Sequence, residues 1–314
     1  MLQGTGAAAQ DTSEPGRGGV IRFAPSGTVA AVNGTDAVSR DTPHTGGPAA
    51  QRQSERRDDG WDDGRADERL GRCLVSVVIP ALNEAKNLRY VLPRIPAGVH
   101  EVLLVDGCST DGTMEVARQL YPSIRLVTQE GKGKGAALRS GFAAARGEII
   151  VMLDADGSTD PAEIPDFVAA LQAGADLAKG SRFLAGGGTA DMSLLRRLGN
   201  GAFVALVRLL FGGRYSDLCY GYNAFRARAL PQLQLDGDGF EIETMINVRA
   251  LRAGLRVVEV PSFEARRIYG KGRLRTFPDG WRVLRTIWRE WRSALRQGMV
   301  PAHSAERARS LIEA

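Results

Sequence analysis

Two aspartates separated by one residue, Asp154 and Asp156, directly follow the hydrophobic residues 149–153. Carboxylates at positions i and i+2 of a turning chain can converge on one hard cation, and Mg²⁺ or Mn²⁺ keeps coordination positions open for phosphate oxygens. An Asp-x-Asp pattern also occurs by chance in many proteins, but its place after an expected strand, with Gly157 beside it, favours a metal. The pattern therefore predicts a divalent-metal site that can bind a diphosphate.

A glycine-rich loop, residues 131–135, carries Lys132 and Lys134. Its spacing matches neither G-x-x-x-x-G-K-[ST] nor a G-x-G-x-x-G directly after the first strand, so ATP hydrolysis and dinucleotide binding are not favoured. The loop would let the backbone approach a nucleotide with Lys134 near its phosphates, or it is a flexible solvent loop. Asp106, which follows another hydrophobic run, could accept a hydrogen bond from a nucleobase or orient its own turn.

Alternating strands and helices are expected to bring these groups together. Buried strands are predicted at residues 73–79, 101–105, 124–127 and 148–153, with helical segments between them. This alternation calls for right-handed crossovers and an α/β fold with a mostly parallel sheet flanked by helices. Ligands of such sheets bind beyond the carboxyl ends of the strands, which is where all of these motifs fall.

The composition restricts the class of protein. The chain has 314 residues, of which 43% are hydrophobic and 25% charged, as is typical of globular proteins. The longest apolar run, residues 202–211, is too short to span a bilayer, and the N-terminus shows no secretory signal. The three cysteines are too few and too scattered for a disulfide framework or a zinc site. A cytoplasmic protein is therefore expected.

The charges are unevenly distributed along the chain. Residues 1–70 contain 8 basic and 11 acidic residues and no apolar periodicity, which predicts a disordered N-terminal extension. Residues 71–275 are expected to form the folded domain, and residues 276–314 a basic amphipathic helix and tail. Between Arg266 and Arg296, ten basic residues oppose two acidic ones, which indicates an anionic partner. Nucleic acid is not expected, because no nucleic-acid-binding signature accompanies the charge.

Two segments are candidates for amphipathic helices. In the C-terminal one, apolar residues recur at spacings of three and four, and an arginine follows each of them by one position. Such a tryptophan seam beside an arginine row suits an anionic membrane interface, at the inner face of the membrane. Alternatively, the seam packs on the domain and the arginines are solvated. The other candidate is residues 192–210, and the seam consists of Trp281, Leu284, Trp288, Trp291 and Leu295.

The order of the motifs resembles that of the family-2 glycosyltransferases of the GT-A fold. Residues 75–84, 105–113, 131–141 and 153–156 carry this resemblance. Later segments are similar to the polyprenyl-phosphate (dolichyl-phosphate) mannose synthase branch, and the resemblance extends over about residues 73–290. It implies a single GT-A catalytic domain that transfers a hexose from a nucleotide-diphosphate sugar to a polyprenyl-phosphate-type acceptor, with inversion and with Mg²⁺ or Mn²⁺. The later segments are residues 179–183, 215–225 and 264–270.

The resemblance also assigns roles to individual residues. Asp154 and Asp156 would hold the metal on the sugar diphosphate, and Arg267 would clamp charge as the site closes. The other implied contacts are Pro80, Asn83, Glu84 and Asp106 with the base and ribose, Arg182 with phosphate, and Arg196 or Arg197 with the acceptor phosphate.

Three positions depart from the pattern of that family. In the family, a second acidic residue often stands at the position of Gly107, after the strand that ends before it. The glycine here leaves the identity of the nucleobase undetermined. Gly272 stands where the branch usually has serine, and Asn200 where an acceptor-binding serine is expected, so the acceptor also stays open. A soluble or saccharide hydroxyl is the alternative acceptor. Less favoured readings are a sugar-nucleotide nucleotidyltransferase and a non-catalytic membrane-binding protein.

The acceptor determines whether a catalytic base is needed. A lipid phosphate is already ionised at neutral pH, whereas a hydroxyl must lose its proton to a carboxylate within hydrogen-bond reach. Asp217, Glu241 and Glu243 are the candidates for this base. The two glutamates lie at an expected helix start, where acidic residues also stabilise the helix dipole without any catalytic role.

Overall fold

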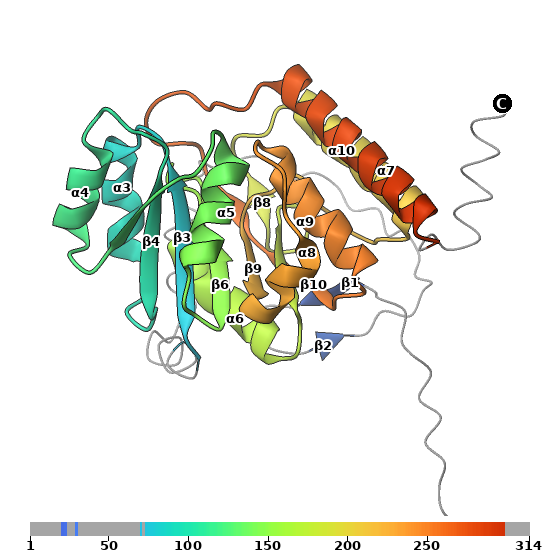
Figure 1. Cartoon of the computed structure of the whole chain (residues 1–314), viewed down its shortest axis with the longest axis horizontal. Coiled ribbons are helices and arrows are strands. Elements are labelled where there is room, and N and C mark those ends of the chain that lie inside the picture. Colours follow the sequence, from blue (N-terminus) through green and yellow to red (C-terminus); the bar gives the residue numbers. More distant parts are fainter. Residues whose placement is uncertain (1–19, 24–28, 31–69, 71–72, 299–314) are drawn as a thin grey trace, which may run out of the picture.

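The computed structural model describes residues 20–23, 29–30, 70 and 73–298 (Figure 1). In these residues, nine strands form one sheet in the order β2-β1-β10-β7-β9-β6-β3-β4-β5. Two shorter strands, β8 (Gly188–Thr189) and β11 (Phe263–Glu264), pair with each other. The strands of the large sheet are β1 (Val20–Phe23), β2 (Val29–Ala30), β3 (Val75–Ala81), β4 (Glu101–Asp106), β5 (Arg125–Thr128), β6 (Ile149–Met152), β7 (Leu177–Ser181), β9 (Asn223–Arg226) and β10 (Val257–Pro261).

The four strands predicted from the sequence are present as β3, β4, β5 and β6. They pair in parallel in the order β6-β3-β4-β5, as the predicted crossovers require. Strand β9 differs, since it runs antiparallel to both of its neighbours, β6 and β7. The predicted α/β fold with a mostly parallel sheet is therefore confirmed.

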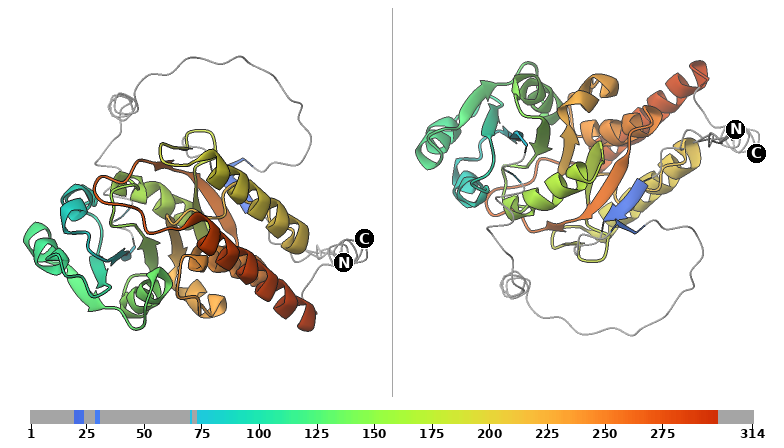
Figure 2. Two further views of the ribbon diagram at one scale, coloured as in Figure 1. Left: turned by 90° about the horizontal axis from the view of Figure 1, so that it is seen from above. Right: turned by 90° about the horizontal axis from the view of Figure 1, so that it is seen from below.

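Helices cover both faces of the sheet, as Figures 1 and 2 show. Alternate residues of β3 belong to different cores, because side chains of a strand point to opposite faces. Val77 and Ile79 pack with α3, α4 and α6, whereas Val78 packs with α5, α7, α9 and α10. The helices are α3 (Ala85–Val91), α4 (Thr113–Leu120), α5 (Lys134–Ala144), α6 (Ile164–Gln172), α7 (Leu194–Phe211), α8 (Leu230–Leu233), α9 (Glu241–Arg252) and α10 (Thr276–Arg296).

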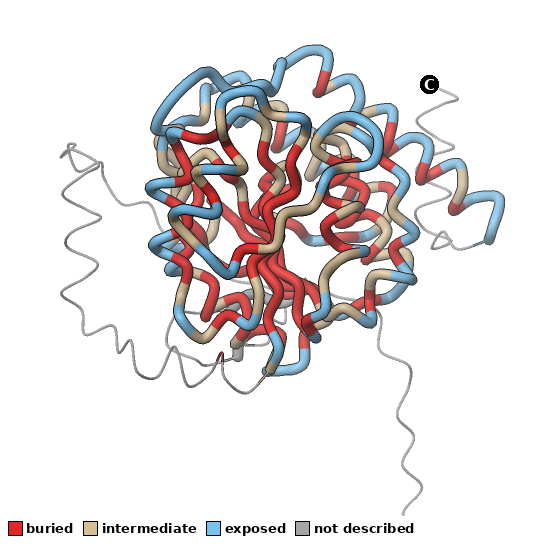
Figure 3. The backbone as a smooth tube through the Cα atoms, turned by 60° about the vertical axis from the view of Figure 1, so that its left-hand side comes forward, coloured by how far each residue is buried: buried red, intermediate tan, exposed pale blue. Residues whose placement is uncertain are grey.

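Strands β3, β4, β6 and β7 are buried along most of their length, so their ends provide the accessible functional groups (Figure 3). Burial on both faces explains why β3, β4 and β6 are continuous hydrophobic runs rather than alternating patterns. The polar side chains that follow these runs are carried to one edge of the sheet.

The N-terminal segment contributes two strands to the sheet. Residues 20–23 form β1, which pairs in parallel with β10, and β2 pairs with β1. These two strands were not among the predicted elements, because the exposed edge of β10 offers backbone hydrogen bonds that a local sequence pattern does not reveal. Most of residues 1–70, and the predicted tail after residue 298, lie outside the described residues.

Helix α10 is attached to the domain by a face different from the predicted seam. Its buried side chains include Val283, Ile287 and Trp291, which pack in the core with α7 and α9. Glu290 is 2% exposed and pairs with Arg249 of α9 at 2.7 Å. Of the five seam residues only Trp291 is buried, so most of the seam forms a separate exposed stripe beside the arginines. None of the helices in residues 73–298 is long and apolar enough to cross a membrane.

Candidate active site

One cavity of about 910 Å³ opens at the carboxyl ends of the central strands and continues between α7 and α10. It contains most of the residues that the sequence suggested, although they come from segments up to 187 positions apart, from Pro80 to Arg267. The predicted residues that line it are Pro80, Glu84, Lys134, Asp154, Asp156, Arg182, Arg196, Glu243 and Arg267. Those that do not are Asn83, Asp106, Arg197, Asp217 and Glu241.

The two aspartates of the Asp-x-Asp pattern lie in the turn after β6. Their side chains are 28% and 23% exposed, so both can reach a ligand in the cavity. One oxygen of Asp156 accepts hydrogen bonds from the backbone and hydroxyl of Ser158, at 3.0 and 2.7 Å, which fixes its rotamer. Gly157 has a φ of +77°, a conformation that glycine adopts without strain and that turns the chain beside the pair.

Lys134 lies between two carboxylates at the start of α5. Its Nζ is 2.6 Å from Asp154 and 2.7 Å from Glu243 of α9. Burial acts to lower the pKa of Lys134, but the two carboxylates outweigh it and raise the pKa above its ordinary value. Burial raises the pKa of Glu243, against the opposing effect of Lys134. Lys134 is thus a charged group held at the aspartate pair, rather than part of a solvent loop.

Arg267 occupies the corresponding position beside the second aspartate. Its guanidinium pairs with Glu84, at the end of β3, and with Asp156 at 3.2 Å. Burial acts to lower its pKa, but the bonds to Glu84 and Asp156 raise it. The backbone N–H of Ile268 donates to the carbonyl of Asp156 at 3.3 Å. The loop after β11 therefore lies across the carboxyl end of the sheet, and Glu84 holds an arginine rather than being free for a ribose.

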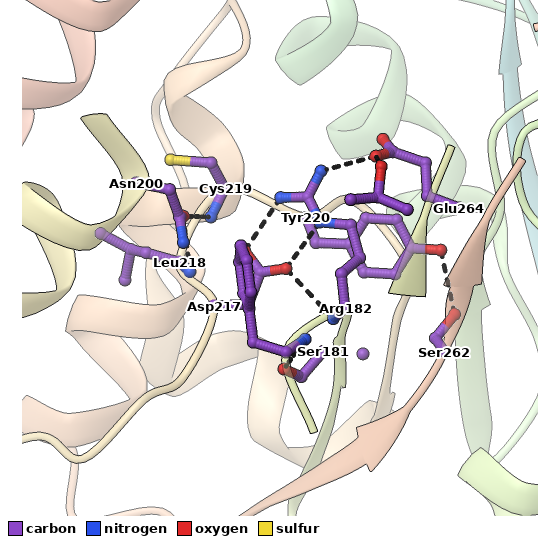
Figure 4. A network of polar contacts seen from close by, with 12 residues as sticks. Ser181, Arg182, Asn200, Asp217, Leu218, Cys219, Tyr220, Ser262 and Glu264 are labelled. Carbon is purple, nitrogen blue, oxygen red and sulfur yellow. Dashed lines mark hydrogen bonds and ion pairs between the residues drawn. The ribbon is translucent and has the colours of Figure 1, made fainter. Parts of the chain in front are cut away.

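Asp217 has a role different from the predicted base (Figure 4). It is fully buried and accepts two hydrogen bonds from the guanidinium of Arg182, at 2.7 and 2.9 Å. Burial would raise the pKa of Asp217, but Arg182 more than reverses this and lowers it below the ordinary value. Arg182 also pairs with Glu264 at 3.0 Å and lies over the ring of Tyr220. Asp217 thus positions Arg182, which reaches the cavity with its charge already shared by two carboxylates.

Glu241 is likewise not placed as a base. Its carboxylate accepts hydrogen bonds from the backbone N–H groups of Asp238 and Gly239, at 3.2 and 2.9 Å, and so caps the start of α9. The helix-start explanation applies to this residue. Glu243 lies two residues further along α9. Because a helix rotates by about 100° per residue, its side chain is on the opposite side of the helix from Glu241 and faces the cavity.

The two residues assigned to the nucleoside but absent from the cavity wall organise the loops beside it. Asn83 has a φ of +57°, and its side chain accepts a hydrogen bond from the backbone of Thr110 at 2.8 Å. Asp106 accepts from the backbone of Ser109 at 3.0 Å, and its other oxygen is buried without a hydrogen-bond partner in the described residues. Asn83 therefore connects the loop after β3 with the loop after β4, whereas Asp106 orients its own turn.

The opposite end of the cavity is apolar. Arg196 lies there at the start of α7, 4.0 Å from Asp191, whereas Arg197 stacks on Phe183 outside the cavity wall. Asn200 lines the cavity, and its side-chain oxygen accepts hydrogen bonds from the backbone of Leu218 and Cys219, both at 3.1 Å, which fixes that loop (Figure 4). The apolar wall comprises Leu195, Phe203, Leu274, Phe277, Trp281 and Leu284.

A divalent ion fits the aspartate pair as part of a complex with phosphate. Within the described residues, no group of three or more His, Cys, Asp or Glu side chains is arranged to hold a metal. Mg²⁺ is usually bound by one or two carboxylates together with substrate phosphates rather than by an all-protein cage. In the ion pairs at this end, four carboxylates share two cations, Lys134 and Arg267, which leaves excess negative charge within this group for a divalent ion.

Sequence reasoning missed several residues that the fold brings to the site. Glu264 was part of a motif of the resemblance, but no role was assigned to it. Gln129 carries no local signal, whereas Gly221 lies in a motif of the resemblance without an assigned role, and most of the apolar wall lies in the two predicted amphipathic segments. Their placement depends on the packing of α7, α9 and α10 against the sheet.

The mostly parallel sheet, its flanking helices and the acidic pair at the carboxyl edge define a glycosyltransferase of the GT-A class. The sequence profile described as glycosyl transferase family 2 matches residues 76–233, about half of the chain, and the chain belongs to this family. The predicted family is thereby confirmed, as is the prediction that the protein is an enzyme.

Two of its relatives bear names of the predicted branch. The chain is 34% identical over 214 residues to the undecaprenyl-phosphate mannosyltransferase of Micrococcus luteus, covering 64% of this chain and 87% of the relative. It is 34% identical over 198 residues to the polyprenol monophosphomannose synthase of Mycolicibacterium smegmatis, covering 59% and 75%.

A solved structure shows the same fold. Glucosyl-3-phosphoglycerate synthase from Mycobacterium tuberculosis, crystallised with Mn²⁺, UDP and glucosyl-3-phosphoglycerate, superposes with a TM-score of 0.59. The match covers 74% of this chain and 84% of that chain at 24% identity. This likeness supports the GT-A fold.

Proposed function

We propose that the protein transfers a hexose from a nucleotide-diphosphate sugar to a polyprenyl phosphate, with inversion at the anomeric carbon and with Mg²⁺ or Mn²⁺. One observation carries the proposal: a single cavity has the Asp154–Asp156 pair at one end and exposed apolar side chains of α7 and α10 at the other. A sugar diphosphate matches the first end and an isoprenoid chain the second. The names of the two relatives support the same acceptor class.

The charged end suits the departure of a nucleoside diphosphate. When bound there, a divalent ion held by Asp154 and Asp156 would stabilise negative charge on the diphosphate. Lys134 and Arg267 add two positive charges at the same place. In the transfer, an acceptor oxygen forms the new bond to the anomeric carbon while the bond to the β-phosphate oxygen breaks, and the electron pair leaves with the nucleoside diphosphate.

The state of the candidate bases favours a phosphate acceptor over a hydroxyl. Asp217 is bound to Arg182, Glu241 caps α9, and Glu243 is bound to Lys134. An ionised phosphate oxygen requires none of them, whereas a hydroxyl would require one to be released. Arg196, at the inner end of α7, faces the cavity with only a distant carboxylate partner and is the candidate contact for the acceptor phosphate.

The surface around the apolar end supports binding to an anionic membrane. Helices α7 and α10 lie side by side there (Figures 1 and 2). Leu194 and Leu198 of α7 are 73% and 64% exposed, and Phe277 and Trp281 of α10 are 77% and 67% exposed. Arginines of α10 border this apolar surface, which is the pattern of a helix that binds an anionic interface. The protein would then act as a peripheral protein at the inner face of the membrane.

A panel of nucleotide sugars tests the proposal. GDP- and UDP-linked hexoses are incubated with the full chain, Mn²⁺ or Mg²⁺ and a short polyprenyl phosphate, and nucleoside diphosphate release and lipid-linked product are measured. A lipid-linked hexose is expected with one donor. Transfer to an added saccharide or phosphoglycerate in place of the lipid would support the alternative acceptor, and release with no metal requirement would contradict the metal role.

A further inference from the structure

We propose that Lys134 and Arg267 are resident counter-cations of the aspartate pair, so that the metal binds tightly only together with the nucleotide diphosphate. The buried Glu84 and Glu243 would act as positioning residues that retain these cations at the site during the exchange. This inference rests on the proposed function, and it concerns the order and coupling of binding.

The charged end contains two ion-pair bridges of the same design. In the first, Lys134 joins Glu243 to Asp154, and its Nζ lies 2.7 and 2.6 Å from their oxygens. In the second, Arg267 joins Glu84 to Asp156. Each bridge thus consists of one glutamate, one cation and one aspartate of the metal pair.

The glutamate and the aspartate of each bridge differ in exposure. The side chains of Glu243 and Glu84 are 7% and 8% exposed, whereas those of Asp154 and Asp156 are 28% and 23% exposed. A charged pair is screened less when it is buried. Each cation is therefore held more firmly by its glutamate, and the aspartate is the partner that it can release.

Close packing keeps the side chain of Lys134, in the first bridge, from turning out into solvent. A Cβ atom at Gly221 would lie 2.8 Å from Glu243 Oε1 and 2.9 Å from Lys134 Nζ, so the backbone of residue 221 closes one side of the bridge. The start of α5 is fixed as well, because the N–H of Gly135 donates to the carbonyl of Asp238 at 2.8 Å. Lys134 can exchange partners within the cavity but cannot leave it.

The second bridge is fixed through the loop that carries it. The Nε of Arg267 donates to the carbonyl of Tyr269 at 2.7 Å. Tyr269 is in turn attached to the buried Asn87 of α3, whose side chain accepts from its N–H at 2.9 Å and donates to its carbonyl at 3.2 Å. The guanidinium consequently stays at the mouth of the donor site in the absence of a ligand.

These contacts determine how a metal would bind. A divalent ion arriving alone must compete with a protein cation on each aspartate. A nucleotide diphosphate arriving with the ion offers phosphate oxygens to Lys134 and Arg267, which frees the aspartate oxygens for the metal. Two ligands that favour the same rearrangement bind cooperatively, and the coupling is reciprocal.

Calorimetric titration of Mn²⁺ into the full chain, without nucleotide and with saturating UDP or GDP, tests this inference. In the wild type, the diphosphate is expected to increase Mn²⁺ affinity at least about tenfold. In Lys134→Met, which keeps the length of the side chain without its charge, Mn²⁺ alone should bind about tenfold more tightly, and the enhancement by nucleotide should fall by a similar factor. Arg267→Met should shift binding in the same direction through Asp156.

Lys132→Met is the matched control, because Lys132 is an exposed lysine of the same loop. It should leave both titrations unchanged. A merely structural role of Lys134 would lower Mn²⁺ affinity in Lys134→Met instead of raising it, and that result would overturn the inference, as would equal Mn²⁺ affinity of the wild type with and without nucleotide. Coupled Mn²⁺ binding without any sugar transfer would reject the proposed function alone, and an absence of Mn²⁺ binding in every titration would overturn both.

Discussion

The two ends of the cavity are built in opposite ways. At the charged end, Lys134 and Arg267 each contact two carboxylates, and the supporting glutamates are almost completely buried. At the apolar end, Phe277 and Trp281 are 77% and 67% exposed and project from helices rather than from strand ends. The side chains of the charged end are paired with one another, whereas the apolar end leaves a surface that another apolar body would cover.

This difference follows from the chemistry that each end would serve. Charge on a departing diphosphate is stabilised by groups that are already in place before the reaction, and ion pairs at rigid strand ends provide such placement. An isoprenoid chain or a membrane requires apolar area but little directional precision, because hydrophobic burial is non-directional. Exposed side chains on two neighbouring helices are sufficient for that purpose.

The largest effect is expected from removing a charge at the aspartate pair. Asp156→Asn should reduce nucleoside diphosphate release by about 10²–10³-fold with excess Mn²⁺, a size typical of the loss of one transition-state stabilising group. Asp238→Asn is the control, because the side chain of Asp238 is 68% exposed and lies outside the cavity wall. Full turnover by Asp156→Asn would show that the charged end is not the donor site.

A large effect on stability is expected from the ion pair behind the charged end. Asp217→Asn should lower the free energy of unfolding by about 3 kcal/mol at pH 7, because the buried guanidinium of Arg182 loses the charge of its carboxylate partner. The lowered pKa of Asp217 means that this contribution is present above its ordinary pKa of 3.8 and is lost as the pH falls through the lower folded-state value.

Urea denaturation of the wild type and of Asp217→Asn, at pH 7 and at pH 3, measures the contribution of the Asp217–Arg182 pair to stability. Asp160→Asn serves as the control, because the pair of Asp160 with Arg94 is 28% and 41% exposed and should contribute less than about 1 kcal/mol. Equal losses for Asp217→Asn and Asp160→Asn would mean that the charged end is no more rigidly supported than the surface.

A moderate effect is expected at the apolar end. Trp281→Ser should weaken flotation with anionic vesicles about tenfold, which corresponds to the loss of one large buried apolar side chain. Release of nucleoside diphosphate with a short, water-soluble acceptor should change little. Leu74→Ser is the matched control, because Leu74 is 45% exposed and lies at the amino end of β3, away from the cavity. Unchanged flotation of Trp281→Ser would remove the membrane from the proposal.

The smallest effect concerns a group beneath the loop that carries Arg267. Burial raises the pKa of Glu163 to about 7, although its hydrogen bonds with the Ser262 hydroxyl and the Phe263 N–H act to lower it. An acid with a raised folded-state pKa favours the fold at low pH, and this contribution is lost as the pH rises through about 7. The wild type should therefore lose about 1 kcal/mol of stability relative to Glu163→Gln between pH 6 and pH 8. Parallel stability profiles of the two proteins in urea would contradict this.

Local sequence patterns were sufficient to predict the fold class, because the hydrophobicity of a segment depends on whether its own strand or helix is buried. The runs that became β3, β4 and β6 are mainly hydrophobic and do not alternate with polar residues, which is the pattern of strands covered on both faces. The antiparallel β9 was not predicted, and neither was β1, since both are stabilised by pairing with strands far away in the sequence. Whether α10 lies on the domain or on a membrane also remained open in the sequence, and the structure shows a buried face together with an exposed apolar stripe.

Some residues of the candidate site were likewise predictable from the sequence, and the roles of others depended on the tertiary structure. The amino-acid order alone placed Asp154 and Asp156 at a strand end, because a hydrophobic run, an acidic pair and a turn-forming glycine are neighbours in the chain. It did not separate Asp217 and Glu241, which support the structure, from Glu243, which faces the cavity with Lys134. That distinction depends on which charges meet across 109 positions of sequence, and such meetings are created when α9 packs beside α5. Short-range patterns encode the strand ends, but long-range packing decides which carboxylates are already paired and which remain available to a ligand.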